Sequence, residues 1–135
     1  MALQLSTAVR NALLDAIETA AGASAVLKVR TGAAPASCAA ADSGTVLATV
    51  SLPADWMVNA AGGVKAKSGT WEDASADAAG TAGHFRLYAA DGTTCHLQGT
   101  ITATGGGGDM TVDNTNFAAG QDFIVSGFTL TAPGA

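Results

Sequence analysis

The segment from His84 to Ile101 constrains the fold more than any other part of the chain. Apolar and polar side chains alternate along it on both sides of an Asp91-Gly92 pair, which is typical of two antiparallel strands joined by a tight turn. A two-residue turn would set Leu87 opposite His96 and so mix apolar with polar side chains. We therefore predict a three-residue loop, residues 90–92, with Gly92 in the left-handed conformation.

This loop would pair Leu87 with Cys95 and Phe85 with Leu97 across the two strands. The predicted buried face then holds five side chains: Phe85, Leu87, Cys95, Leu97 and Ile101. The other face, which we expect to be mainly solvated, holds the polar set: His84, Arg86, Tyr88, Thr94, His96 and Gln98. On that face His84 and His96 flank Arg86, and the alternative to a solvated surface is a polar cluster that serves an interface.

Several other segments also have strand character, and they are separated by stretches rich in Gly, Ala, Pro and Ser. Thr45 to Leu52 alternates, with Leu47 expected to face outward. The tetraglycine at 105–108 predicts a loop. The expected strands lie at residues 25–30, 45–52, 69–73, 84–101, around 110–112 and 123–131. This pattern predicts a mainly β fold, an antiparallel β-sandwich or barrel-like domain with one N-terminal α-helix.

The helix is expected between an N-cap at Ser6 and a C-terminal Gly22. Its predicted apolar stripe recurs at three- and four-residue steps and carries three large side chains, Val9, Leu13 and Ile17, among alanines. Two interpretations remain open: the stripe packs on its own domain, or it docks on a neighbouring subunit. We assign residues 1–22 to this amphipathic helix and 23–135 to the β-sandwich domain, within one domain overall.

Composition bears on how such a domain is stabilised. Of its 135 residues, 31 are alanine, so few large apolar side chains are left for a core. The low charge content of 13% argues against disorder. A folded chain with a thin core gains from burying further surface, which favours an oligomer or a component docked on a larger assembly.

Charge and cysteine usage exclude several classes of partner. The net charge is −5 and the six basic residues are scattered, which removes the electrostatic basis for binding nucleic acid or an anionic membrane. The N-terminus lacks the features of a signal peptide. Cys38 and Cys95 could form one bridge across a long loop, but nothing else indicates an oxidising compartment, so free thiols are expected.

No group of residues predicts catalysis, a metal site or a cofactor. Cys95 and His96 are adjacent, but neighbours in a strand point to opposite faces and cannot easily share one ion. The same separation argues against a cysteine nucleophile with a histidine base. The acidic residues at 109, 113 and 122 lack the ligand spacing of a calcium loop. We expect a protein that is not an enzyme.

Trp56 and Trp71 are the largest apolar side chains, and both are expected beside loops. They either seal the ends of the core or anchor a contact with another protein. Together with the helix and the polar face of the hairpin they complete the candidate interface, which we list as Val9, Leu13, Ile17, Trp56, Trp71, His84, Arg86 and His96.

Three segments of the chain resemble a group of small structural proteins encoded by tailed bacteriophages. They are Leu5–Ala12 with Ile17-Glu18-Thr19, Leu27–Pro35, and Gly83–Tyr88 continuing to Gln98-Gly99-Thr100. The likeness covers most of the chain and carries no catalytic motif. It implies a virion component, made in the host cytoplasm, such as a capsid decoration protein, and leaves open whether that component belongs to the head or the tail.

Three hypotheses follow from the residues and the resemblance together. The first is a trimeric decoration or cement protein that binds the major capsid protein and itself and stabilises the assembled shell. The second is a tail- or fibre-associated component whose exposed loops carry recognition. The third, from another class, is a small hydrolase or metal-dependent enzyme.

Overall fold

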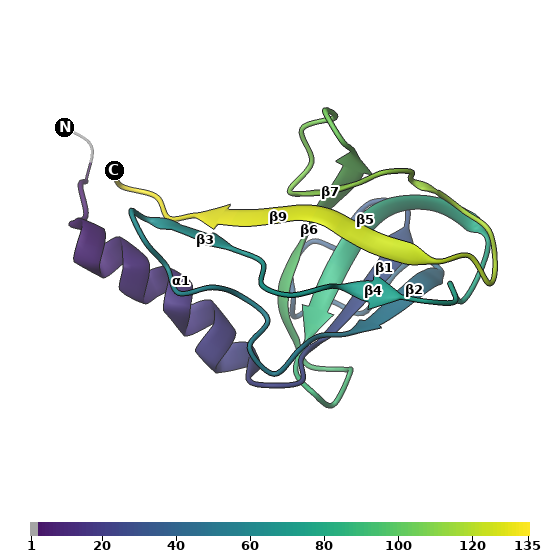
Figure 1. The fold of residues 1–135 in the computed structure, drawn as a ribbon, viewed down its shortest axis with the longest axis horizontal. Coiled ribbons are helices and arrows are strands. Elements are labelled where there is room, and N and C mark those ends of the chain that lie inside the picture. Colours follow the sequence, from purple (N-terminus) through teal and green to yellow (C-terminus); the bar gives the residue numbers. More distant parts are fainter. Residues whose placement is uncertain (1–2) are drawn as a thin grey trace.

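A computed structural model describes residues 3–135 and confirms a mainly β fold with one N-terminal helix (Figure 1). The elements in chain order are α1 (Thr7–Ala21), β1 (Val26–Thr31), β2 (Val46–Ser51), β3 (Val64–Ala66), β4 (Glu72–Asp73), β5 (Gly80–Tyr88), β6 (Cys95–Ala103), β7 (Met110–Val112), β8 (Asn116–Phe117) and β9 (Phe123–Thr131). In the part of the chain that is described, no helix is long and apolar enough to cross a bilayer.

The strands form a single curled sheet, a half-barrel, in the order β2-β1-β5-β6-β7-β9-β3. Two short strands lie off this path, where β4 pairs with β9 and β8 pairs with β5. The pairs are antiparallel except β6 with β7, which run parallel. β4 and the chain after it also reach the free edge of β2. The N–H of Thr49 donates to Asp73 Oδ2 at 2.9 Å, and the N–H of Asp77 donates to the Leu47 carbonyl at 2.8 Å. These contacts bring the two ends of the curled sheet together.

The predicted register of the β5–β6 hairpin is wrong. Cys95 lies opposite Tyr88, and a bulge next to Leu87 then sets Leu97 opposite Leu87. The period of a strand is two, so the one-residue shift in the pairing of Cys95 moves it from the predicted core face to the face of Arg86. The core side chains Phe85, Leu87 and Ile101 lie where the alternation predicts, and Leu97 packs partly against the core.

The cause of the error is a hairpin loop longer than the three residues expected. Ala89 donates its N–H to the Thr94 carbonyl at 2.9 Å, so residues 90–93 form the loop. Asp91 stabilises it, because one carboxylate oxygen accepts the N–H groups of Thr93 and Thr94. Gly92 has φ 71°, in the left-handed region predicted for it.

A row of aromatic side chains crosses the centre of the core. Ring centroids lie 6.1 Å apart for Trp56 and Trp71, 5.6 Å for Trp71 and Phe128, and 5.5 Å for Phe128 and Phe85. Both indoles are fully buried, and each donates its N–H to a backbone carbonyl. Two large buried rings, with both polar N–H groups bonded, compensate in part for the many alanines elsewhere.

Two strands are more buried than alternation predicts. Leu47 was expected to face outward, but a bulge in the β1–β2 pair leaves it out of register, and it belongs to the core. In β5 the predicted solvated face is also covered: His84, Arg86 and Tyr88 are all buried. The Gly- and Ala-rich loop between β1 and β2 packs over these side chains and shields them from solvent.

Candidate functional site

The helix α1 presents a different face to the domain from the one predicted. Its caps are as expected, with Ser6 Oγ accepting the N–H of Val9 at 3.2 Å and Gly22 donating to the Glu18 carbonyl at 2.9 Å. The buried residues, however, are Arg10, Leu14 and Ala21. Of the predicted stripe, only the partly buried Ile17 packs against the core.

The reason is a polar flank that fastens α1 to the segment before and within β3. Asn11 accepts the N–H of Gly63 at 2.8 Å, Asp15 that of Ala60 at 3.0 Å, and Glu18 that of Met57 at 2.9 Å. These N–H groups belong to an irregular segment with little regular pairing of its own. Unpaired buried N–H groups are costly, so the helix must turn its polar flank toward this segment.

Lys65 on β3 completes this attachment. Its side chain is only 1% exposed, and Nζ lies 2.7 Å from Asp15 Oδ1 and 3.1 Å from Glu18 Oε1. Burial works against the charged ammonium, but the two carboxylates outweigh it and raise the pKa of Lys65. The hydrogen bond from Lys65 likewise lowers the pKa of Asp15, with the Ala60 N–H adding to the effect.

The two ends of the helix are fixed as well. The guanidinium of Arg10 donates to the Ala132 carbonyl from Nη2 at 3.1 Å and packs against Gly63, where a Cβ would meet it at 2.3 Å. Trp56 donates its indole N–H to the Gly22 carbonyl at 3.1 Å. The N–H of Leu5 donates to the Gly134 carbonyl at 2.7 Å, so the segment before the helix and the segment after β9 meet beside it (Figure 1). The helix is therefore held along its length.

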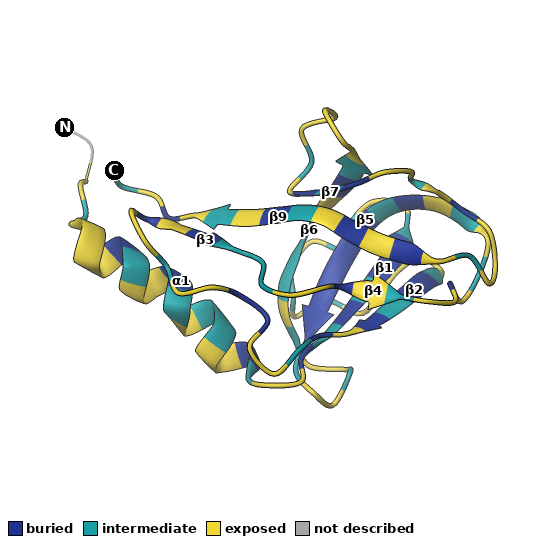
Figure 2. Ribbon diagram, viewed as in Figure 1, coloured by how far each residue is buried: buried dark blue, intermediate teal, exposed yellow. Residues whose placement is uncertain are grey.

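This attachment leaves the predicted apolar stripe in solvent. The side chains of Val9 and Leu13 are 46% and 47% exposed. Three alanines on the same side, Ala12, Ala16 and Ala20, are also exposed, and Figure 2 shows the alternation of exposed and buried residues along the helix. We call the set Val9, Ala12, Leu13, Ala16 and Ala20 the outer face of α1. It is a narrow apolar surface on a helix whose position is fixed.

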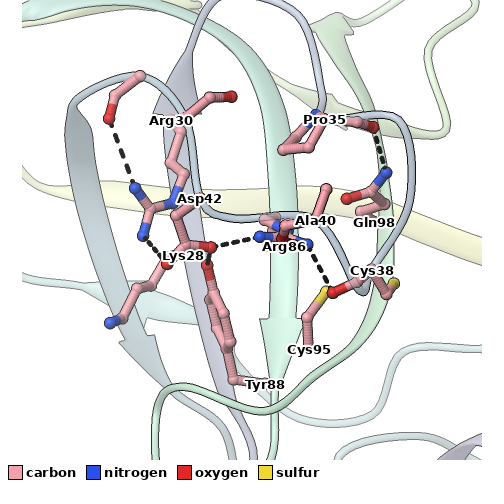
Figure 3. A network of polar contacts seen from close by, with 12 residues as sticks. Lys28, Arg30, Pro35, Cys38, Ala40, Asp42, Arg86, Tyr88, Cys95 and Gln98 are labelled. Carbon is pink, nitrogen blue, oxygen red and sulfur yellow. Dashed lines mark hydrogen bonds and ion pairs between the residues drawn. The ribbon is translucent and has the colours of Figure 1, made fainter.

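A second feature is a buried polar cluster beneath residues 32–45, the loop between β1 and β2 (Figure 3). Arg86 lies at its centre and is 2% exposed. From Nη2 it donates to three loop carbonyls, those of Ser37 at 3.1 Å, Cys38 at 2.9 Å and Ala40 at 3.2 Å. One guanidinium thus holds the tip of the loop on the sheet.

Asp42 joins this cluster from the loop side. It accepts hydrogen bonds from Arg86 Nη1 and from the Tyr88 hydroxyl, the latter at 2.6 Å, and forms an ion pair with Arg30 at 3.1 Å. Burial disfavours the charged carboxylate, but these partners prevail and lower the pKa of Asp42. The pKa of Tyr88 is raised by burial and by its bond to this carboxylate. The arrangement is a structural ion-pair network in which one carboxylate serves two buried guanidinium groups.

The eight candidate interface residues therefore separate into an exposed and a buried group, with Ile17 between them, partly buried against the core. Val9, Leu13 and His96 are exposed. The interface role proposed for Trp56, Trp71, His84 and Arg86 is corrected by their burial within the chain, which leaves them no surface for a partner. His84 contacts the Gly32 carbonyl through Nδ1 at 2.9 Å, so it belongs to the loop attachment and is separated from His96.

The acidic residues considered for calcium have local partners or open surroundings. Asp109 accepts hydrogen bonds from the N–H and hydroxyl of Thr100 at 2.9 and 3.0 Å. Asp113 and Asp122 line a small pocket of about 70 Å³ beside β7 and β9. Across residues 3–135 there is no group of three or more side chains that could hold a metal ion.

Sequence reasoning missed Asp42, Lys65 and the buried face of α1. A signal for the cluster was present: Lys28 and Arg30 share one face of β1, and His84 and Arg86 share one face of β5. The two strands pair with Lys28 opposite Arg86 and Arg30 opposite His84. Four basic side chains on one sheet face require a carboxylate cover, and Asp42 in the following loop supplies it.

Comparisons with known proteins do not place the chain in a family. A scan against protein-family models finds no match, and searches of curated proteins and of solved structures also find none. Two features of the structure remain as guides to function: the outer face of α1, and the loop at residues 32–45 that the buried polar cluster holds on the sheet.

Proposed function

We propose that this protein is a structural component of a tailed-bacteriophage virion, most simply a capsid decoration protein that binds the major capsid protein and copies of itself. The observation that carries the proposal is the outer face of α1, an apolar surface on a helix fixed to its domain by ion pairs and hydrogen bonds. A protein that binds a repeated lattice needs such a rigid surface, since ordering a mobile one would cost affinity.

The protein would stabilise the capsid shell through its binding equilibrium with the assembled lattice. A protein that binds the assembled lattice and not the free subunits stabilises the lattice by an amount that grows with its concentration and affinity. Closed cyclic symmetry is the common solution for copies that also bind one another, and a trimer suits a surface with three-fold positions. Small side chains on the outer face would let neighbouring backbones approach closely.

The test is the copy number and position of the chain in purified phage particles. Quantitative mass spectrometry combined with cryo-electron microscopy of those particles should find copies on the order of hundreds, arranged on the head lattice. Copies numbering a few or tens and located on the tail would replace the decoration role with that of a tail or fibre component. Particles that lack the chain would refute a virion role.

A further inference from the structure

We infer that Cys38 and Cys95 form a redox pair, and that a disulfide between them locks residues 32–45 onto the sheet. The two cysteines come from different parts of the chain. Cys38 lies in the loop between β1 and β2, and Cys95 begins β6. This inference concerns the chemistry of the chain itself and does not depend on the proposed function.

The geometry that brings them together starts with Arg86. Its guanidinium donates to the Cys38 carbonyl at 2.9 Å, which fixes that part of the loop above the sheet. The four-residue hairpin loop sets Cys95 opposite Tyr88, on the same side of the sheet as Arg86. In Figure 3 the two sulfur atoms lie near each other beside this guanidinium, and the neighbouring Cys38 contributes to the raised pKa of the Cys95 thiol.

Both residues are free thiols of intermediate exposure, so a small oxidant can reach them without unfolding of the chain. Their environments give them different parts in the reaction. Burial raises the pKa of the Cys95 thiol to about 11, and its contact with Cys38 adds to the effect. A thiol held protonated is a poor nucleophile, so Cys38 reacts first and Cys95 second.

The oxidant is a low-molecular-weight disulfide such as oxidised glutathione. The Cys38 thiolate attacks one of its sulfurs, the S–S bond breaks, and one glutathione leaves and takes up a proton. The Cys95 thiolate then attacks the Cys38 sulfur and releases the second glutathione. Two protein thiols are oxidised to one disulfide, and one glutathione disulfide is reduced to two thiols.

The bridge would join Cys95, at the start of β6, to Cys38 in a loop that hydrogen bonds already hold. The two residues are far apart in sequence. A cross-link of this kind restricts the unfolded chain more than the folded one and so stabilises the fold. We expect the bridged protein to melt about 5 °C or more above the reduced protein. The Sγ–H of Cys95 donates to the Leu97 carbonyl at 3.5 Å in the reduced form, and the bridge would replace this weak bond.

The test exposes the reduced, full-length protein to oxidised glutathione, followed by thiol counting, intact-mass measurement and peptide mapping. We expect the loss of both thiols, a mass lower by two hydrogens, and a linked peptide that contains Cys38 and Cys95. Two free thiols, a stable glutathione adduct on the native chain, or a disulfide between two chains would each overturn the inference. A bridged protein that melts no higher than the reduced one would contradict the locking role.

A matched control moves the thiol by one residue. The S37C/C38S variant keeps two cysteines, but its loop thiol sits on the exposed position 37. This variant should accumulate the glutathione adduct and close the internal bridge at least tenfold more slowly than the native chain. Closure at the native rate would show that the position of Cys38 is unimportant and would contradict the inference. The C95S variant should stop at the adduct.

Discussion

At the scale of single residues, a few buried charges hold segments that have little regular structure. Arg86 binds three carbonyls of one loop, and Lys65 joins α1 to β3 through Asp15 and Glu18. Each cation is nearly inaccessible to water, so its partners are needed to offset the cost of its burial. Removing one partner leaves an uncompensated charge inside the fold.

Asp42→Ala is expected to destabilise the chain. It removes the carboxylate from Arg86, Arg30 and Tyr88 at once. The carboxylate itself is 41% exposed, but its loss leaves two buried guanidinium groups without their anion, so we expect a cost of about 1–3 kcal/mol of unfolding free energy. Urea denaturation measures the loss. Asp55→Ala, at an exposed position, is the control and should change the free energy by less than about 0.5 kcal/mol. Equal effects of the two substitutions would contradict the structural role of the cluster.

Stability should also fall at acid pH through Asp15. Because its pKa in the folded chain lies below the ordinary 3.8, the unfolded chain takes up the proton first as the pH falls. The stabilisation is complete above about pH 4 and is lost as the pH falls through the lowered folded pKa. Asp42 contributes in the same direction.

Asp15→Asn should therefore reduce the difference in urea midpoint between pH 6 and pH 3 without abolishing it, since Asp42 still titrates. Asp55→Asn is the matched control and should leave that difference unchanged. An Asp15→Asn protein with the full native pH dependence would refute the assignment to this carboxylate.

At the scale of elements, alternation and capping predicted where strands and the helix lie better than which way they face. The last strand, at 123–131, has the predicted bounds, and α1 begins and ends at its predicted caps. The short strands β3 and β8 fall in stretches expected to be irregular. They consist of two or three residues paired to distant strands, and so short a segment carries no periodic signal of its own.

The predictions of which face is buried were wrong for a different physical reason in each element. In α1 most of the apolar side chains lie on the outer face, so the sequence pattern predicted that this face is buried. Backbone N–H groups that donate to Asn11, Asp15 and Glu18 instead set the orientation of the helix. In β6, the four-residue hairpin loop moved Cys95 to the opposite face. Both depend on contacts with residues more than thirty positions away or on loop geometry, which local pattern does not encode.

Two adjacent leucines on the helix test its orientation. Leu14 is buried and Leu13 is half exposed, so Leu14→Ala should cost about 2–4 kcal/mol of unfolding free energy and Leu13→Ala less than about 1 kcal/mol. Urea denaturation of the two variants compares the same chemical change on neighbouring positions. A larger cost at Leu13 would show that the predicted stripe packs on the domain after all.

The β5–β6 loop is tested at Gly92. A Cβ there would meet only Lys28 Nζ, at 3.9 Å, so any cost of substitution arises from the positive φ and not from a clash. Gly92→Val should destabilise the chain by about 1 kcal/mol or more, and Gly92→Asn by less, since asparagine tolerates the left-handed region. Thermal unfolding of the two variants provides the comparison. Equal costs would argue against backbone strain at this position.

At the scale of the whole molecule, the chain combines a small aromatic core with a helix and a loop that polar contacts hold against the sheet. The half-barrel buries both tryptophans, the loop at 32–45 covers the second face of β5, and α1 is held at the margin with its apolar side outward. A protein with this plan gains stability when further copies or a lattice cover that side. We propose that such assembly occurs through the outer face of α1.

The most direct test of this claim is the mass of the purified protein by light scattering at tens of micromolar, beside that of a Val9→Glu/Leu13→Glu variant. We predict an oligomer, a trimer, for the native chain and a folded monomer for the variant. The variant should keep the native circular dichroism spectrum, because neither side chain is buried in the domain, and should unfold at a lower urea concentration than the native oligomer. A monomeric native chain, or a variant that keeps the native mass, would contradict the claim.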